Sequence, residues 1–412
     1  MIGSPSDPDE TSCISRLRRV EKTCRSRSRS KFDILEYNMH VFLVDYDMHT
    51  KRVIDKISSA IWTVRYNKCG DFELKIPADE AMKGPIEHHD GIYFPQSGDY
   101  MLVESIEMTT DEDQGDYVTL KGRTYDSLLD RRIIPTTMIV NYSFMNVVFG
   151  ILNQNVLNPQ NSARKMNELT WIWPENMPAD QGGNISAQYT GDNCLELIQK
   201  LCQERHVGYR MPYRPTFPRM ERYQFQLYWG VERHFNQQKN PYVIFSPDYD
   251  NLRKTKYLTS AEKEKTIAYV AGEGEGKDRK GRWADRKGTP AIFQARTNSG
   301  WRRKEIFIDA RDIQSKNAGD NIISTQEYLA MLEQRGREKL VDHTVTSVYD
   351  GELVPTSQWK FGEDFKMGDV VQIQNRLGIM SVGRVTEYIR SYTPDEGWNE
   401  YPTFETYYKQ EG

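Results

Sequence analysis

Alternating glycines after an apolar run are the feature of this sequence that most resembles a ligand-binding motif. The three glycines are Gly272, Gly274 and Gly276. They follow residues 265–272, which read as a strand, and a nucleotide-binding loop also places glycines directly after a strand. However, Lys277 stands where the fingerprint has its third glycine, and Glu273 and Glu275 would repel a phosphate from the backbone N–H groups. We therefore interpret this segment, with Arg279, as a mobile loop or a subunit contact.

A second group with metal-binding side chains is formed by the adjacent residues His88, His89 and Asp90. Neighbouring residues of a strand point to opposite faces, so these three side chains would not converge on one ion. The chain has only seven histidines, and no HExxH motif is present. A solvated turn is the favoured interpretation, and we expect no metal and no cofactor.

Nucleophilic and acid–base catalysis find no support in the sequence. Neither a GxSxG motif nor a catalytic-cysteine signature occurs. Glu104 and Glu107 could resemble the carboxylate pair of a glycosidase, but they lie three residues apart in one expected strand and so face opposite sides. We therefore expect that the protein is not an enzyme.

Arg131 and Arg132 end the first strand-rich part of the chain, directly after the segment Leu128–Asp130. One interpretation is a surface ion pair, which would contribute little to stability. The other is a contact between subunits, where arginine is enriched. Both interpretations remain open, and the two arginines join the glycine loop as candidate interface residues.

The composition is typical of a folded protein of two to four domains, with 38% hydrophobic and 28% charged residues in 412. A net charge of −4 provides no electrostatic footprint for nucleic acid. Five cysteines, an odd number without CxxC spacing, predict reduced thiols and assembly in a cytoplasm. No run is apolar enough for a signal peptide or a transmembrane helix.

The elements that would position these residues are mostly strands. Residues 1–38 are basic and rich in Ser and Arg, which predicts a disordered tail or a true start at Met39, with a basic arm for DNA or lipid as the alternative. Alternating apolar residues predict strands at 41–47, 61–77 (a hairpin), 100–108, 117–123, 222–229, 242–246, 265–272, 305–311, 343–349, 369–375 and 379–389. Apolar stripes predict helices at 144–152, 193–205 and 325–341.

These elements divide the chain into a tail and three further parts. Residues 39–135 form a first β module, 136–250 are mixed α+β insert modules, and 251–412 form a second β module that contains the helix at 325–341. The fold class is therefore α+β and mostly β. The segment 158–190 is long, polar and interrupted by Pro and Gly, and no helix or strand is predicted in it.

Several of these motifs together resemble the tail-hub proteins of siphoviruses. The resemblance begins with IWTVRYNKCGDFELKIP, YMLVESIE and GRTYDSLLDRR, and continues in order with YDNLRKTKYLTS, TIAYVAGEGEGKDR, GEDFKMGDVVQI and IRSYTPDEG. It covers about residues 39–404. Each motif is weak by itself, whereas their order and spacing are more specific.

The resemblance implies a fold similar to the central hub of contractile-tail baseplates, with two β-barrel modules related to the tail tube and smaller mixed modules between them. It implies a homotrimeric ring in the virion tail that contacts distal-tail or tail-tube proteins and tip or fibre proteins. The tape-measure protein and DNA would pass through the lumen without specific DNA binding. Some relatives carry a C-terminal enzymatic extension, and this chain ends soon after its last expected strand.

Two alternatives from other functional classes follow from the same features. A tail-tip enzyme that degrades the cell wall or cleaves peptides is one, because carboxylates are plentiful. A carbohydrate-binding receptor module is the other, because aromatic residues reach 11%.

Overall fold

The computed structural model divides the chain into two units, Met1–Asn38 and Met39–Gly412. It describes residues 39–111, 115–174, 180, 182–213, 223–276, 279–285, 299–316, 322–354, 358–374 and 380–407. The predicted basic tail lies outside these residues. No helix within them is both long and apolar enough to cross a membrane.

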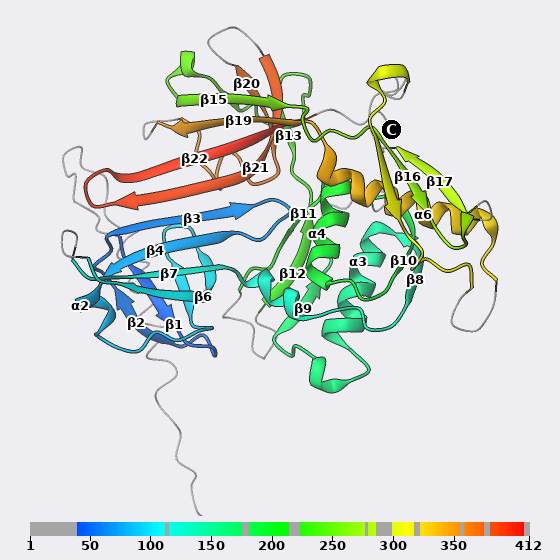
Figure 1. Ribbon diagram of the computed structural model, residues 1–412. Helices are drawn as coiled ribbons and strands as arrows, with labels where there is room; N and C mark the ends of the chain where they lie inside the picture. The colour runs from blue at the N-terminus through cyan, green and yellow to red at the C-terminus, as the bar shows by residue number, and fades with distance from the viewer. Residues whose placement is uncertain are drawn as a thin grey trace, which may run out of the picture. The chain divides into compact units, whose positions relative to one another are not determined.

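The first set of strands curls around one apolar core (Figure 1). Its order in the sheet is β3-β4-β7-β6-β5-β1-β2. Alternation along β4 points Phe72, Leu74 and Ile76 inward, as predicted. The ring of Trp62 on β3 stacks on Phe94 of β5 at 4.5 Å, although three strands separate them in the sheet, so the sheet bends strongly. The strands are β1 (Val41–Val44), β2 (Thr50–Ile54), β3 (Ser59–Arg65), β4 (Asp71–Pro77), β5 (Gly91–Phe94), β6 (Asp99–Thr109) and β7 (Tyr117–Thr124).

The second set of strands comes from the C-terminal part and from a segment near residue 240. Its core contains Phe245, Tyr388 and Phe404, which are fully buried. The strands are β13 (Glu232–Arg233), β14 (Ile244–Phe245), β15 (Leu252–Ser260), β19 (Thr346–Leu353), β20 (Val370–Gln374), β21 (Met380–Thr393) and β22 (Gly397–Thr406). The order β15-β19-β22-β21 continues directly into β3 of the first set.

This junction bears on the two expected β-barrel modules, which the described residues do not confirm as closed barrels. β21 pairs with β3 in antiparallel register, and the strands of the two sets form one sheet of 14 strands. Arg65 and Glu387 stand opposite each other across the junction, and Arg65 Nε donates to Glu387 Oε1 at 2.7 Å. Each set thus covers an edge of the other, which satisfies the backbone groups that barrel closure would otherwise have to pair. The expected α+β and mostly β class is confirmed.

The sequence indicated that the strand at 379–389 is the last one, but a further strand follows it. β21 extends to Thr393, and a turn leads into β22, which pairs with it along almost its whole length. Pro402 lies inside β22 and weakens its strand signal, since proline cannot donate to a ladder hydrogen bond. Tertiary pairing with β19 and β21 outweighs this local penalty.

The insert has its own core, built from two small sheets and two helices. The predicted helices are confirmed, and Asn193 caps α4 by accepting from the N–H groups of Leu195 and Glu196. The segment 158–190, in which no element was predicted, contains β9 and β10. The elements are β8 (Met138–Ser143), α3 (Phe144–Leu152), β9 (Leu169–Ile172), β10 (Asn184–Tyr189), α4 (Cys194–Glu204), β11 (Gly208–Arg210) and β12 (Tyr223–Tyr228).

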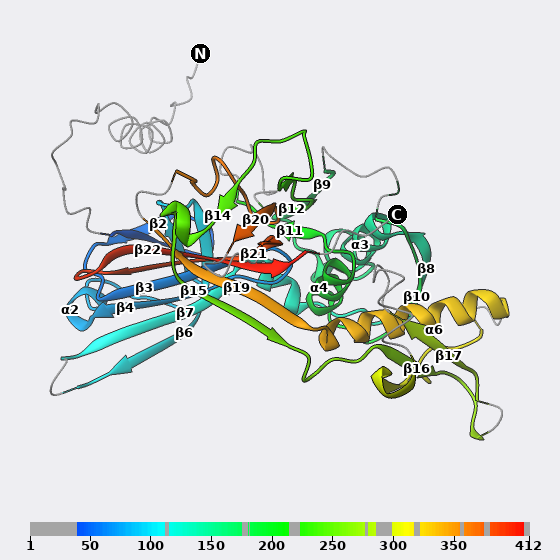
Figure 2. The same ribbon diagram turned by 90° about the horizontal axis from the view of Figure 1, so that it is seen from above.

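A third sheet, in the order β17-β16-β18, is covered on one face by α6 (Figure 2). Gly336 of α6 faces Ala284, and a Cβ on this glycine would lie 2.4 Å from the Ala284 side chain. The helix can therefore approach the sheet closely only because residue 336 has no side chain. The elements are β16 (Ile267–Ala271), β17 (Gly281–Asp285), β18 (Glu305–Asp309) and α6 (Thr325–Leu340), which was predicted.

Short helical segments complete the described residues. They are α2 (Ala78–Ala81), η1 (Tyr125–Arg131), η2 (Asn153–Leu157), η3 (Ser162–Arg164), η4 (Pro247–Tyr249), η6 (Gly300–Arg302) and η7 (Val341–His343). Three cysteines within the described residues, Cys69, Cys194 and Cys202, are free thiols. Burial raises the pKa of Cys194 to about 11, so this thiol stays protonated and unreactive at neutral pH.

Candidate functional site

The alternating glycines lie in the loop of the β16–β17 hairpin, against α6. The Gly272 N–H donates to the Lys280 carbonyl at 2.8 Å, and the Glu273 N–H donates to the Tyr328 hydroxyl at 2.8 Å. A Cβ on Gly272 would lie 2.2 Å from the same hydroxyl. Gly272 is therefore needed where the loop meets the helix. Its part in a subunit contact stays a prediction.

The other two glycines serve the turn itself. Gly274 has φ 101°, a conformation that residues with side chains rarely adopt, and Gly276 has φ 54° with open space around it. Lys277, which breaks the nucleotide fingerprint, lies outside the described residues. A phosphate cradle has its loop followed by a helix, whereas the next described element of this chain is strand β17.

Arg279 holds this hairpin to the neighbouring strand. Its guanidinium donates to the carbonyls of Ala271 at 2.9 Å and Gly272 at 3.0 Å, and it pairs with Asp309 of β18 at 2.5 Å. Hydrogen bonds from Arg311, and then from Arg279, lower the pKa of Asp309. The candidate Arg279 therefore has a role within the chain, which leaves a further role at an interface open.

Arg131 and Arg132 differ in their surroundings. Arg132 Nε donates to the carbonyl of Arg164 at 2.8 Å and so connects the end of η1 to the insert. Arg131 is exposed, and its Nη2 lies 3.1 Å from Nδ1 of His89. Asp130, the nearest carboxylate in sequence, pairs with Arg123 at 3.3 Å instead. Arg131 is thus the more available of the two for a partner.

The group at 88–90 is built as a structural turn. Asp90 is buried, and its carboxylate accepts from Lys51 Nζ at 2.9 Å and from the Glu87 N–H at 2.8 Å. The backbone of His89 is left-handed, with φ 78°, as is common in turns. The described residues contain no cluster of three or more side chains able to hold a metal ion. This carboxylate therefore stabilises the loop between α2 and β5.

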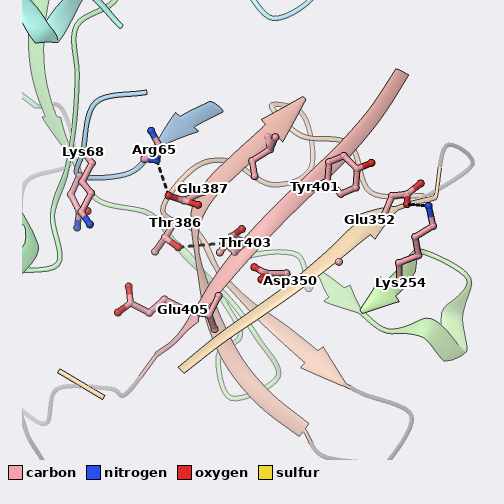
Figure 3. Close-up of a pocket in the computed structure, with 14 residues that line it drawn as sticks. Arg65, Lys68, Lys254, Asp350, Glu352, Thr386, Glu387, Tyr401, Thr403 and Glu405 are labelled. Atoms are coloured by element: carbon pink, nitrogen blue, oxygen red, sulfur yellow. Dashed lines mark hydrogen bonds and ion pairs between the residues drawn. The ribbon is translucent and has the colours of Figure 1, made fainter. Parts of the chain in front are cut away.

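The carboxylates weighed for catalysis are engaged in structural contacts. Glu104 forms a two-point hydrogen bond with Arg123, at 2.8 Å for both oxygens. Glu338 is the described carboxylate with a pKa raised to about 7, and burial is the main cause. Its oxygen accepts from the Tyr189 hydroxyl at 2.7 Å and from Gln334 at 3.2 Å. Glu338 thus lies between α6 and β10 and does not line the hollow of Figure 3.

Figure 3 shows a shallow hollow on the second set of strands, near the junction with β3. We call it the acidic hollow. Arg65 and Glu387 form one ion pair there at 2.7 Å, and Lys254 and Glu352 form another at 2.8 Å. The lining residues are Arg65, Asn67, Lys68, Lys254, Val348, Asp350, Gly351, Glu352, Thr386, Glu387, Ile389, Tyr401, Thr403 and Glu405. Four carboxylates face three cations across an open strand surface, an arrangement that fits contact with another surface better than enclosure of a small substrate.

The third sheet presents a row of rings on the side opposite α6. Tyr269 on β16 stands in register with Trp283 on β17 and Phe307 on β18. Their ring centroids lie 4.9 and 6.2 Å from that of Tyr269. We call this row the aromatic face. The sequence interpretation missed it because β17 lies in a charged segment, although the alternation of Arg282, Trp283 and Ala284 carries a weak strand signal.

Comparison with known proteins places the chain among phage proteins. The sequence model of the family described as Siphovirus ReqiPepy6 Gp37-like protein matches residues 39–403. The resemblance expected from the ordered motifs is thereby confirmed. None of the curated proteins matches the sequence.

Three solved structures share the fold over most of their length. The prophage MuSo2 43 kDa tail protein from Shewanella oneidensis has a TM-score of 0.52 and 12% identity, covering 89% of this chain and 98% of its own. Prophage tail protein gp18 from Listeria monocytogenes EGD-e has a TM-score of 0.51 and 11% identity, covering 91% of this chain and 95% of its own. The tail protein from Neisseria meningitidis MC58 has a TM-score of 0.51 and 11% identity, covering 90% of this chain and 97% of its own. At these identities the likeness establishes a common fold.

Proposed function

Because the chain belongs to the family of siphovirus ReqiPepy6 Gp37-like proteins, we propose that it is a structural protein of a phage tail. The finer proposal is a homotrimeric ring at the tail tip that joins the tail tube to tip or fibre proteins. The observation that carries it is the family match over residues 39–403 together with a fold shared along about nine-tenths of the chain with tail proteins.

The architecture supports this assignment through its repeated strands. Two strand sets, each with its own core, are joined edge to edge through β3 and β21. We propose that each set corresponds to one of the tail-tube-like modules implied by the resemblance. Three copies would then present six such modules, which suits an adaptor between a six-fold tube and a three-fold tip.

The surroundings of the candidate groups give a structural role more support than a catalytic one. Asp90, Glu104 and Glu338 each hold neighbouring elements together through hydrogen bonds. We therefore propose that the chain is not an enzyme, that it works without a cofactor, and that DNA and the tape-measure protein pass through its lumen.

The mass of the purified full-length chain tests the ring directly. Light scattering is expected to report three times the chain mass, and negative-stain imaging is expected to show a ring with a central hole. A stable monomer that clears peptidoglycan in a zymogram, with clearing lost on a single carboxylate substitution, would replace the proposal with the enzymatic alternative. Binding on a glycan array would favour the receptor-module alternative.

A further inference from the structure

The third sheet and α6 form a module that joins the rest of the fold at one place. The chain leaves the second strand set after Ser260, at the end of β15, and returns to it at Thr346, the first residue of β19. These two residues are register partners, and the Lys265 N–H donates to the His343 carbonyl at 3.0 Å. Both connections therefore run side by side. We call the described residues between 266 and 341 the α6 module.

The α6 module has its own apolar core and meets the insert mainly through polar contacts. Figures 1 and 2 show α6, β16 and β17 at the end of the folded unit away from the first strand set. Leu332 is fully buried in the core of the module, and Ile139 is the insert residue that packs against this core among the described residues. Arg335 donates to the Gln188 carbonyl at 3.3 Å, and the Gln314 N–H donates to Gln188 Oε1 at 3.2 Å. A unit with its own core, connected at one place and docked by hydrogen bonds, can move as a body.

Two carboxylates meet in the buried centre of this contact. Glu338 of α6 is 4% exposed, and the side chain of Glu204 of α4 is 5% exposed. The Gln334 amide nitrogen donates to both, at 3.2 Å to Glu338 and at 2.6 Å to Glu204. From β10, the Tyr189 hydroxyl donates to Glu338 at 2.7 Å. Because two carboxylates bound to one nitrogen repel each other, burial favours the protonation of one of them.

The cations at this contact are paired with other carboxylates. Arg205 Nε lies 3.4 Å from Glu204 Oε1, and Arg335 pairs with Asp312 at 2.9 Å. Glu338 itself forms no ion pair within the part of the chain that the structure describes. A buried anion without a cation is far less favourable than a neutral acid, so Glu338 is the carboxylate that holds the proton.

We propose that the α6 module is a proton-locked hinge. It stays docked on the insert while Glu338 is protonated, and it swings away about its paired connections when this proton is lost. An ionised Glu338 would face Glu204 in the docked state without a cation of its own, whereas water solvates both carboxylates in the open state. The inference concerns the motion of one chain and does not depend on the proposed ring.

The direction of the pH dependence follows from the docked state. Burial, and then repulsion from Glu204, raises the pKa of docked Glu338 to about 7, against an ordinary value of 4.5. The docked state therefore binds more protons than the open state between pH 4.5 and 7. The ratio of open to docked chain should rise by up to about tenfold per pH unit in this window and level off above it.

The distance between two spin labels tests the hinge. The labels are attached at Gln326→Cys in the first turn of α6 and at Tyr142→Cys on β8, both exposed positions, in the full-length chain. Cys13→Ser and Cys24→Ser remove two further thiols. Burial raises the pKa of the three remaining thiols, so they react slowly with the label. An excess of unlabelled chain removes distances between copies.

The wild type should show one distance at pH 5 and a second, longer distance at pH 7.5, with an open-to-docked ratio roughly 50-fold higher. Glu338→Gln keeps an acceptor for Tyr189 and cannot ionise, so it should show the docked distance at both pH values. Glu196→Gln, at an exposed carboxylate of α4, is the matched control and should keep the wild-type response. Glu204→Gln removes the repelling charge, so the total rise should shrink and end at a lower pH.

Three outcomes would overturn the proposal. A single distance at both pH values in the wild type would show that the module does not open. An equal share of the longer distance in the wild type and in Glu338→Gln at pH 7.5 would show that the module moves without this proton. Circular dichroism checks that Glu338→Gln folds, and if it does not, Glu204→Gln decides, since a wild-type pH response in that variant would contradict the lock.

Discussion

The Tyr189 hydroxyl donates a 2.7 Å hydrogen bond to the Glu338 carboxylate, and this contact joins β10 of the insert to α6. Gln334 donates to the same carboxylate at 3.2 Å and to Glu204 of α4 at 2.6 Å. Burial, and then repulsion from Glu204, raises the pKa of Glu338 to about 7. The cluster therefore keeps a proton at a junction between three elements.

The first prediction concerns the pH dependence of this junction. The folded pKa of Glu338 lies above its ordinary value of about 4.5, so the folded state binds more protons than the unfolded state between pH 4.5 and 7. Stability should consequently fall as pH rises through this window, by about 2–3 kcal/mol for this buried group. Glu338→Gln keeps the oxygen that accepts from Tyr189 and removes the titration.

Urea unfolding at pH 5 and pH 8 measures this effect. The variant should be close to the wild type at pH 5 and more stable at pH 8. Glu327→Gln on the same helix is the control and should show no pH-dependent gain. The other charged groups at the site, Glu204, Arg335 and Arg205, are retained in both variants. Equal stability differences at the two pH values would contradict the assignment.

The second prediction concerns the core of the first strand set. Trp62 is fully buried, stacks on Phe94, and donates from its indole N–H to Ser97 at 3.2 Å. Trp62→Ala should lower the free energy of unfolding by about 3–5 kcal/mol, because a large cavity replaces the ring. Trp301→Ala, at an exposed tryptophan, should leave unfolding within about 0.5 kcal/mol. Similar losses at both sites would show that the curled core is not organised around Trp62.

The third prediction separates the glycines of the hairpin loop. Gly272→Ala forces a methyl group against the Tyr328 hydroxyl and should cost about 1–3 kcal/mol. Gly276→Ala meets open space and should cost about 1 kcal/mol for its left-handed backbone. Thermal and urea unfolding would rank the two variants.

A rescue experiment identifies the cause of the larger loss. The double variant Gly272→Ala with Tyr328→Phe removes the clashing hydroxyl, so its loss should be smaller than the sum of the two single losses. If Gly272→Ala instead keeps its stability and loses only assembly mass, the loop serves a subunit contact and the steric explanation is wrong.

The fourth prediction concerns residues 1–38. Their basic, Ser/Arg-rich composition cannot form an apolar core, and the chain divides at Asn38. Deleting them should leave the melting temperature within about 1 °C and the assembled mass per chain unchanged apart from the missing residues. A large loss of stability would show that this segment docks into the folded unit.

The sequence by itself determined the elements whose signals are local. The helices α3, α4 and α6 follow from apolar periodicity, with Asn193 as the cap of α4, and the β3–β4 hairpin follows from alternation around Gly70. The ordered motifs also determined the family. Such signals depend on residues a few positions apart. The side-chain periodicity and the capping geometry that they reflect are the same in every fold.

Tertiary structure alone decided which strands share a sheet. Arg65 and Glu387 are 322 residues apart in sequence yet lie opposite each other, and nothing in either strand specifies that pairing rather than two closed barrels. The strand β22 and the aromatic face were likewise found only in the tertiary structure. Pro402 and the charges around Trp283 obscure their local sequence patterns. Strand edges are chemically alike, so burial and shape across the whole fold decide their partners.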